Sequence, residues 1–163
     1  MTTKCYFYGS NLADDKLTRN RGIISFAIPD YGVVFRSQYE GNTYECEYAA
    51  ALALIRFIQL NHQHFQSKKI TFLTDSAIVV CQVSRKVTAT KRLKRLRDLV
   101  LFYKRKYGFE LDWVPSRRNR AQSAIDCTAT SPKAPKFNYA IFEESTKKKQ
   151  LKSKSGDSIK MAS

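Results

Sequence analysis

The chain has 163 residues and carries 29 Lys and Arg against 14 Asp and Glu, a formal net charge of +15. This length suits one domain with a tail and argues against a second hydrophobic core. A chain this basic favours a polyanionic partner, such as nucleic acid or an anionic membrane, with a generic solubility surface as the alternative.

Cysteine spacing and hydropathy exclude further classes of protein. The four cysteines, Cys5, Cys46, Cys81 and Cys127, form no CxxC pair and no metal-ligand spacing, so we expect reduced thiols and no zinc site. No apolar run is long enough to cross a membrane, and the first predicted strand begins too early to leave room for a signal peptide. We therefore expect an intracellular protein that is neither secreted nor attached to a membrane.

The first predicted elements are three strands. Lys4–Ser10 is short and aromatic, which is typical of a buried central strand, and the polar residues 11–21 after it predict a loop. Gly22–Ile28 and Val33–Tyr39 are rich in β-branched and aromatic residues and are separated by the turn Pro29–Gly32. This spacing predicts an antiparallel pair next to the first strand.

The next predicted element is an apolar helix. Asn42 is followed three residues later by Glu45, which indicates a capping box at the start of a helix. The Ala, Leu and Ile residues of Ala49–Leu60 continue this helix and are too apolar for a surface element. We therefore expect the helix to lie across the sheet.

Beyond this helix, strands and helices alternate. Ile70–Thr74 predicts a short strand, Asp75–Gln82 a short helix and Arg85–Thr90 an irregular segment. Phe109–Val114 alternates as a further strand, and Asn119–Thr128 predicts a terminal helix. This alternation predicts a mixed sheet covered by helices.

The longest predicted helix lies between the irregular segment and the last strand. Its apolar residues recur at steps of three and four, as expected for a helix with one buried face. These apolar positions are Leu93, Leu96, Val100, Tyr103 and Tyr107. Over residues 85–106, ten basic residues stand against the single acid Asp98, which predicts phosphate binding, with a solvated helix face as the alternative.

The composition changes after residue 130. Pro132 and Pro135 end the last helix, an aromatic patch follows at 137–142, and a Lys- and Ser-rich segment closes the chain. We expect a domain over residues 1–130 and a basic tail over 131–163, whose end beyond the patch is disordered. The patch would either pack back on the domain or dock on a protein partner, and the sequence leaves both open.

Four stretches, by their order and spacing, resemble the ribonuclease H (RNase H) family. Cys5–Ser10 is similar to an aromatic first strand that ends in Asp-Gly-Ser, with Tyr8 in place of the aspartate. Thr43–Ala50 resembles the start of the family's first helix, and Leu73–Ser76 resembles the end of its fourth strand. Trp113–Asn119 is similar to the fifth strand and the loop that opens the last helix.

The resemblance implies an α/β fold with a mixed five-stranded sheet. Three antiparallel strands plus two parallel strands would be flanked by helices, in the order β-β-β-α-β-α-α-β-α. The family hydrolyses the RNA strand of an RNA–DNA hybrid with two divalent metal ions, which clamp the attacking water and the leaving oxygen. Carboxylates from the first strand, first helix, fourth strand and last helix hold these ions.

Two of the family's four acids have counterparts in this sequence. Glu47 falls at the first-helix acid, with an ordinary helix glutamate as the alternative. Asp75 falls at the fourth-strand acid, with a helix N-cap as the alternative. The resemblance thus makes Glu47 and Asp75 the candidate catalytic residues and the candidate metal ligands.

The other two family acids are substituted. Tyr8 carries a neutral phenol, which cannot bridge two cations as a carboxylate does. Counting four residues on from Asn119 places Ser123 at the last acid, whereas a shifted register would place Asp126 there. Without that shift, we expect the site to hold no metal ion, or one Mg²⁺ or Mn²⁺ ion weakly.

Candidates for nucleic-acid contact combine basic residues with family positions that approach the backbones of the bound strands. They are Ser10, Ser76, Arg85, Lys86, Lys91, Arg92, Lys94, Arg95, Arg117, Arg118 and Asn119. We expect recognition by shape, sugar hydroxyls and phosphates rather than by base identity.

The sequence therefore favours an RNase H-like domain that binds RNA, RNA–DNA hybrid or structured RNA and has lost hydrolysis. One alternative is an active, metal-dependent RNA–DNA hybrid endoribonuclease, whose site is completed by Asp14, Asp15 or Asp126. The other alternative is a basic protein-interaction or architectural module of a ribonucleoprotein.

Overall fold

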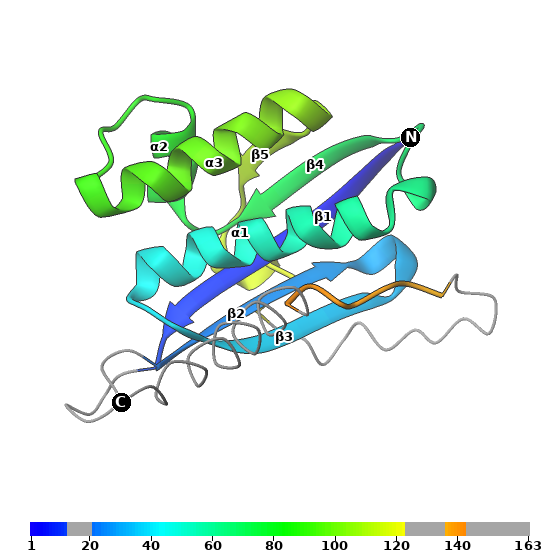
Figure 1. Ribbon diagram of the computed structural model, residues 1–163, viewed down its shortest axis with the longest axis horizontal. Coiled ribbons are helices and arrows are strands. Elements are labelled where there is room, and N and C mark those ends of the chain that lie inside the picture. The colour runs from blue at the N-terminus through cyan, green and yellow to red at the C-terminus, as the bar shows by residue number, and fades with distance from the viewer. Residues whose placement is uncertain (13–20, 123–135, 143–163) are drawn as a thin grey trace, which may run out of the picture.

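The computed structural model describes residues 1–12, 21–122 and 136–142, which build a five-stranded sheet with helices packed on it (Figure 1). The strands are β1 (Thr2–Asn11), β2 (Arg21–Ile28), β3 (Val33–Glu40), β4 (Lys69–Thr74) and β5 (Glu110–Trp113). Across the sheet they follow the order β3-β2-β1-β4-β5. β2 pairs antiparallel with β1 and β3, whereas β4 pairs parallel with β1 and β5. The expected mixed sheet is confirmed.

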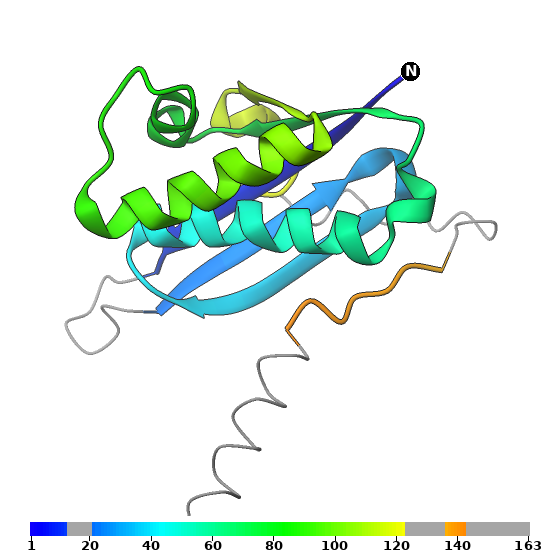
Figure 2. The same ribbon diagram turned by 45° about the horizontal axis from the view of Figure 1, so that its top comes forward.

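Within these residues the helices are α1 (Thr43–Leu60), α2 (Ala77–Val83) and α3 (Lys91–Tyr107). α1 and α3 lie side by side over the sheet and run in the same direction (Figure 1 and Figure 2). Arg92 and Glu45 form an ion pair of 3.2 Å where the helices begin, and Gln59 donates a hydrogen bond to Tyr107 where they end. In the described ranges, none of the helices combines the length and the apolar composition that crossing a bilayer requires.

The core lies between α1 and the sheet. Tyr48 and Phe57 of α1 are fully buried, as are Phe7 and Phe72, which contribute an edge-to-face ring pair from β1 and β4. Val100 of α3 joins the same core. α1 is therefore enclosed by the sheet and by α3, which explains why a helix this apolar does not face solvent.

The start of α1 is fixed by a cap and by a close approach to β1. The predicted capping box is present, with the Asn42 side chain accepting the Glu45 N–H at 2.9 Å. A Cβ at Gly9 would lie 2.2 Å from the carbonyl carbon of Cys46 and 2.3 Å from the nitrogen of Glu47. Because Gly9 has no side chain, the first turns of α1 can rest directly on β1.

The aromatic patch packs back on the domain. The Phe137 ring lies 5.4 Å from the Phe57 ring and 5.7 Å from the Tyr31 ring. The buried Asn61 side chain accepts the Asn138 N–H at 2.6 Å and donates to the Asn138 carbonyl at 2.9 Å. Of the two placements that the sequence left open, the structure has the intramolecular one. The domain boundary at residue 130 stays a prediction, because residues 123–135 lie outside the described part of the chain.

α2 begins later than the sequence predicted. Its N-cap is Ser76, whose hydroxyl accepts the Val79 N–H at 3.4 Å, so Asp75 lies before the helix and leaves its carboxylate for other partners. The interpretation of Asp75 as a helix cap is therefore wrong. Asp75 follows β4 directly, at the carboxyl ends of the parallel strands, where α/β proteins bind their ligands.

Gly9→Ala is expected to destabilise the fold by about 3 kcal/mol or more, because the new methyl group would overlap main-chain atoms of α1. Gly108→Ala is the matched control. Gly108 has a φ of 67°, but an added Cβ would meet no heavy atom within 4 Å, so we expect a loss of only about 1 kcal/mol from backbone strain. Chemical denaturation measures both variants, and equal losses would contradict the close approach of β1 and α1.

Candidate functional site

The candidate residues gather where β1 and β4 approach their carboxyl ends. The parallel ladder pairs Tyr6 with Leu73, so Tyr8 and Asp75, two residues further along each chain, stand at the same level. Glu47 lies in the early part of α1, next to the residue that rests on Gly9. The fold therefore brings one position from each of β1, α1 and the end of β4 into one region.

Both carboxylate oxygens of Asp75 accept hydrogen bonds from neutral donors. The Asn119 amide donates to Oδ1 at 2.7 Å, and the Ser116 hydroxyl donates to Oδ2 at 2.8 Å. The Trp113 indole N–H also donates to the Asp75 main-chain carbonyl at 3.2 Å. Asp75 is thus oriented by the loop that follows β5, the neighbouring parallel strand.

Asn119 connects three segments. Its side chain is 1% exposed, and besides Asp75 its amide donates to the carbonyl of Phe7 on β1 at 2.9 Å. Its side-chain oxygen accepts the Ala121 N–H at 3.1 Å, which holds residues 119–122 in a turn instead of the first turn of the expected terminal helix. The Ser25 hydroxyl on β2 donates to the Ala121 carbonyl at 2.6 Å and fixes this turn to the sheet.

Glu47 points toward the end of β4. Its Oε2 accepts the Ser76 hydroxyl at 2.7 Å. Burial raises the pKa of the Glu47 carboxyl from 4.5 to about 7; the hydrogen bond from Ser76 acts against this shift, and the negative charge of Asp75 adds to it. Glu47 is therefore partly protonated near neutral pH, and its charge is coupled to that of Asp75.

Of the two positions where the sequence lacks a family acid, Tyr8 and Ser123, the structure describes only Tyr8. Residues alternate along β1, and because Gly9 faces α1, Tyr8 faces the other side of the sheet, where it is partly exposed and packs near Ala27 and Ala121. Ser123 lies outside the described residues. Asp126, Asp14 and Asp15 also lie outside the described residues. These are the acids that complete the site in the alternative of an active endoribonuclease.

The described residues do not fit a two-ion centre. They contain no group of three or more His, Cys, Asp or Glu side chains that could hold a metal ion. Glu47 and Asp75 alone would have to supply the carboxylates, and three of their four oxygens already accept hydrogen bonds from Ser76, Ser116 and Asn119. A pair of divalent ions a few ångströms apart needs bridging carboxylates that this donor set lacks.

Exposed cations flank the site on two sides. Arg117 and Arg118 directly follow Ser116, the partner of Asp75, and Arg92 of α3 pairs with Glu45, two residues before Glu47. The basic candidates from the sequence are all exposed: Arg85, Lys86, Lys91, Arg92, Lys94, Arg95, Arg117 and Arg118. Ser10 is partly exposed near the end of β1, and its hydroxyl donates to the Asn11 carbonyl at 3.4 Å.

Two residues of the site were not among the sequence candidates. Ser116 orients Asp75, and Trp113 is 49% exposed beside it, with its indole N–H on the Asp75 carbonyl. The sequence did indicate that the end of β5, where both residues lie, is close to Asp75. β5 was expected to run parallel to β4, and the carboxyl ends of neighbouring parallel strands meet at one edge of the sheet. The loop conformation that turns Ser116 toward Asp75 had no such signal.

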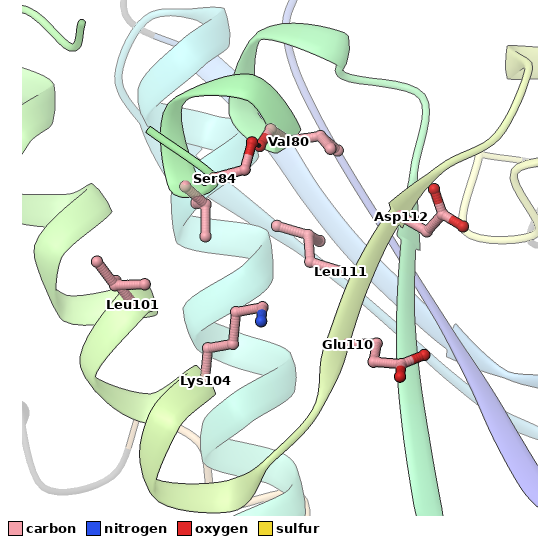
Figure 3. A pocket seen from close by; sticks show the side chains of 8 residues that line it. Val80, Ser84, Leu101, Lys104, Glu110, Leu111 and Asp112 are labelled. Atoms are coloured by element: carbon pink, nitrogen blue, oxygen red, sulfur yellow. Dashed lines mark hydrogen bonds between the residues drawn. The ribbon is translucent and has the colours of Figure 1, made fainter. Parts of the chain in front are cut away.

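A separate cleft opens between α2, α3 and β5 (Figure 3). Its volume is about 320 Å³, and Leu111 and Lys104 point into it from β5 and α3, whereas Glu110 and Asp112 point away. The complete lining is Val80, Val83, Ser84, Leu101, Lys104, Glu110, Leu111 and Asp112. None of these residues belongs to the site around Asp75.

Comparison with known proteins identifies the fold. No protein-family model matches the chain, and no curated protein matches its sequence. Among solved structures, LC11-RNase H1, isolated from compost by a metagenomic approach, superposes with a TM-score of 0.64 at 18% identity, over 76% of this chain and 91% of that one. RNase H1 from Halobacterium salinarum gives a TM-score of 0.58 at 19% identity, over 76% and 94%. The chain has the RNase H-like fold.

One neighbour of this RNase H-like domain was solved with nucleic acid. LC11-RNase H1 in complex with an RNA/DNA hybrid superposes with a TM-score of 0.61 at 17% identity, over 74% of this chain and 91% of that chain. At such identities the likeness concerns the fold, so the activity of this RNase H-like domain has to be argued from its own site.

Asn119→Ala is expected to destabilise the domain by about 2–3 kcal/mol, because it leaves the Phe7 carbonyl and the Asp75 carboxylate without their buried donor. Asn119→Asp should be at least as harmful, since it replaces the donor by a second carboxylate facing Asp75. The exposed Gln122→Ala serves as the control. Urea denaturation reports all three, and an unchanged stability of Asn119→Ala would contradict the central role of this amide.

The raised pKa of Glu47 predicts that the stability of the protein falls as the pH rises. Its folded-state pKa of about 7 lies above the unfolded value of 4.5, so its contribution to stability is complete below pH 4.5 and is lost as pH rises through 7. Glu47→Gln should therefore stabilise the protein relative to wild type at pH 8 by about 1–2 kcal/mol after solvent screening, and much less at pH 5. Denaturation curves at both pH values measure this, and a stability difference independent of pH would contradict it.

Proposed function

We propose that this RNase H-like domain binds RNA–DNA hybrid, or RNA of similar helical shape, and does not hydrolyse it. The observation that carries the proposal is the pair of carboxylates Glu47 and Asp75, each of which accepts hydrogen bonds from neutral donors. In the described residues no third acid joins them in a group that could hold a metal ion, and exposed cations flank the pair. By the sequence resemblance, Tyr8 of β1 stands where the RNase H family has an aspartate, which supports the proposal.

The absence of hydrolysis follows from the donor set. The two-metal mechanism of the family needs cations that share carboxylate ligands, and the neutral phenol of Tyr8 does not supply one. The neutral donors Ser116 and Asn119 satisfy Asp75 in the way that a cation otherwise would. The site is thus stable as a hydrogen-bonded network without divalent ions.

Binding follows from the surrounding charge. Exposed cations stand at Arg117 and Arg118, directly after Ser116, and at the start of α3, and we expect them to contact the two backbones of a duplex. The partly protonated Glu47 lowers the negative charge that an incoming phosphate meets between them. The hybrid complex of a structural neighbour supports the choice of ligand.

One titration tests the proposal: labelled RNA–DNA hybrid against pure protein with Mg²⁺ or Mn²⁺, scored for retention and cleavage together. We expect binding that weakens steeply with salt, and no cleavage. Replacing Arg117 and Arg118 together by alanine should lower the slope of log affinity against log salt by about 1.8, the effect of two phosphate contacts.

The matched control replaces Lys68 and Lys69 by alanine. Lys69 begins β4 and Lys68 precedes it, at the end of the strand away from Asp75. Their replacement removes the same number of positive charges. An equal effect on the salt slope would contradict a localised site. Cleavage that Glu47→Gln and Asp75→Asn abolish would instead make the protein an active endoribonuclease. Binding of an acidic protein in preference to hybrid would make it a protein-interaction module.

A further inference from the structure

The most exposed large apolar side chain of α3 is the aromatic Phe102, on the outer face of the helix. Phe102 follows the buried Leu93 by nine residues, about two and a half helical turns, so it points away from the core. Phe102 is 56% exposed, and Leu99 beside it is 41% exposed. The ring of Phe102 lies edge to face against the Tyr103 ring at 5.2 Å, and more than half of the residue remains open to solvent.

The charges around Phe102 are positive except for Asp98, which lies one helical turn before it. Arg95, Leu99, Phe102 and Lys106 are spaced by four, three and four residues and form one stripe, with Lys91 and Arg105 at its margins. Lys91, Arg95 and Arg105 form no ion pair with any residue that the structure describes. Asp98, the one acid of α3, is held by Arg97 at 2.8 Å.

This stripe begins beside the start of α1, the helix that carries Glu47, and leads away from it. The ion pair of Arg92 with Glu45 places the start of α3 beside the start of α1, and the hydrogen bond between Gln59 and Tyr107 keeps the two helices together to their ends. α3 has 17 residues and is therefore about 25 Å long. A strand that leaves the site at this end can follow the whole stripe.

We propose that the outer face of α3 binds single-stranded nucleic acid, with an unpaired base stacked on Phe102 and phosphates on the flanking cations. An exposed aromatic ring among cations matches both parts of such a strand, because every base has a π-face and every phosphate a charge. This inference rests on the proposed function in one respect only, namely that the single strand continues from a duplex bound at the candidate site. An apolar partner helix fits less well, since Leu99 and Phe102 are the only exposed apolar side chains of the stripe.

The test measures the affinity of the whole chain for three labelled ligands. They are a blunt RNA–DNA hybrid, the same hybrid with a single-stranded overhang of about 10 nucleotides, and the overhang strand alone. Phe102→Ala should weaken binding of the last two about tenfold and leave the blunt hybrid unchanged. Phe102→Tyr, which keeps a ring, should retain wild-type affinity, and Leu99→Ala, its apolar neighbour, should change none of the three.

Each outcome decides between the proposals. Equal affinities of wild type and Phe102→Ala for the overhang ligands would overturn this inference, even where the blunt hybrid binds as proposed. Binding of the single strand through Phe102, with no binding of the blunt hybrid, would support this inference and contradict the proposed function. Binding of polyglutamate, weakened equally by Leu99→Ala and Phe102→Ala, would assign the stripe to an acidic protein and overturn the inference.

Discussion

The buried amide of Asn119 is the interaction on which the arrangement of the site depends. One side chain joins the Phe7 carbonyl of β1, the Asp75 carboxylate after β4 and the Ala121 N–H of the last turn. Separating any of these groups leaves a buried polar atom without a partner, which costs more than the hydrogen bond itself contributes. β1, β4 and the segment after β5 therefore keep one relative position, and Ser116 reaches Asp75 because of it.

The same hydrogen bonds set the chemistry of the site. Carboxylates that accept neutral donors, one of them with a pKa raised to about 7, are stable without a bound cation. In the proposed function, the cations on both sides of this pair attract a phosphate backbone, and the raised pKa of Glu47 reduces the negative charge between them. In the proposed function the RNase H-like fold thus retains a nucleic-acid surface while its site lacks the ligands for hydrolysis, and the outer face of α3 extends that surface.

Local sequence signals predicted the fold because they agree with the tertiary structure. Asn42 and Glu45 form the expected cap, and the apolar run after them is the buried helix. The close contact of β1 with α1 at Gly9 was not predicted. The site was less predictable. Its hydrogen bonds join residues far apart in the chain, as between Ser116 and Asp75, and depend on a loop conformation without a local signal. The raised pKa of Glu47 depends on burial that only packing creates.

A titration of the protein–hybrid complex with Mn²⁺, followed by electron paramagnetic resonance, distinguishes a site without divalent ions from a two-ion centre. The free-ion signal reports how many ions bind, and their mutual coupling reports whether two lie close together. With Glu47 and Asp75 as the only carboxylates of the described site, we expect no coupled pair of ions on the wild-type complex. Two coupled Mn²⁺ ions per complex, lost in both Glu47→Gln and Asp75→Asn, would contradict it.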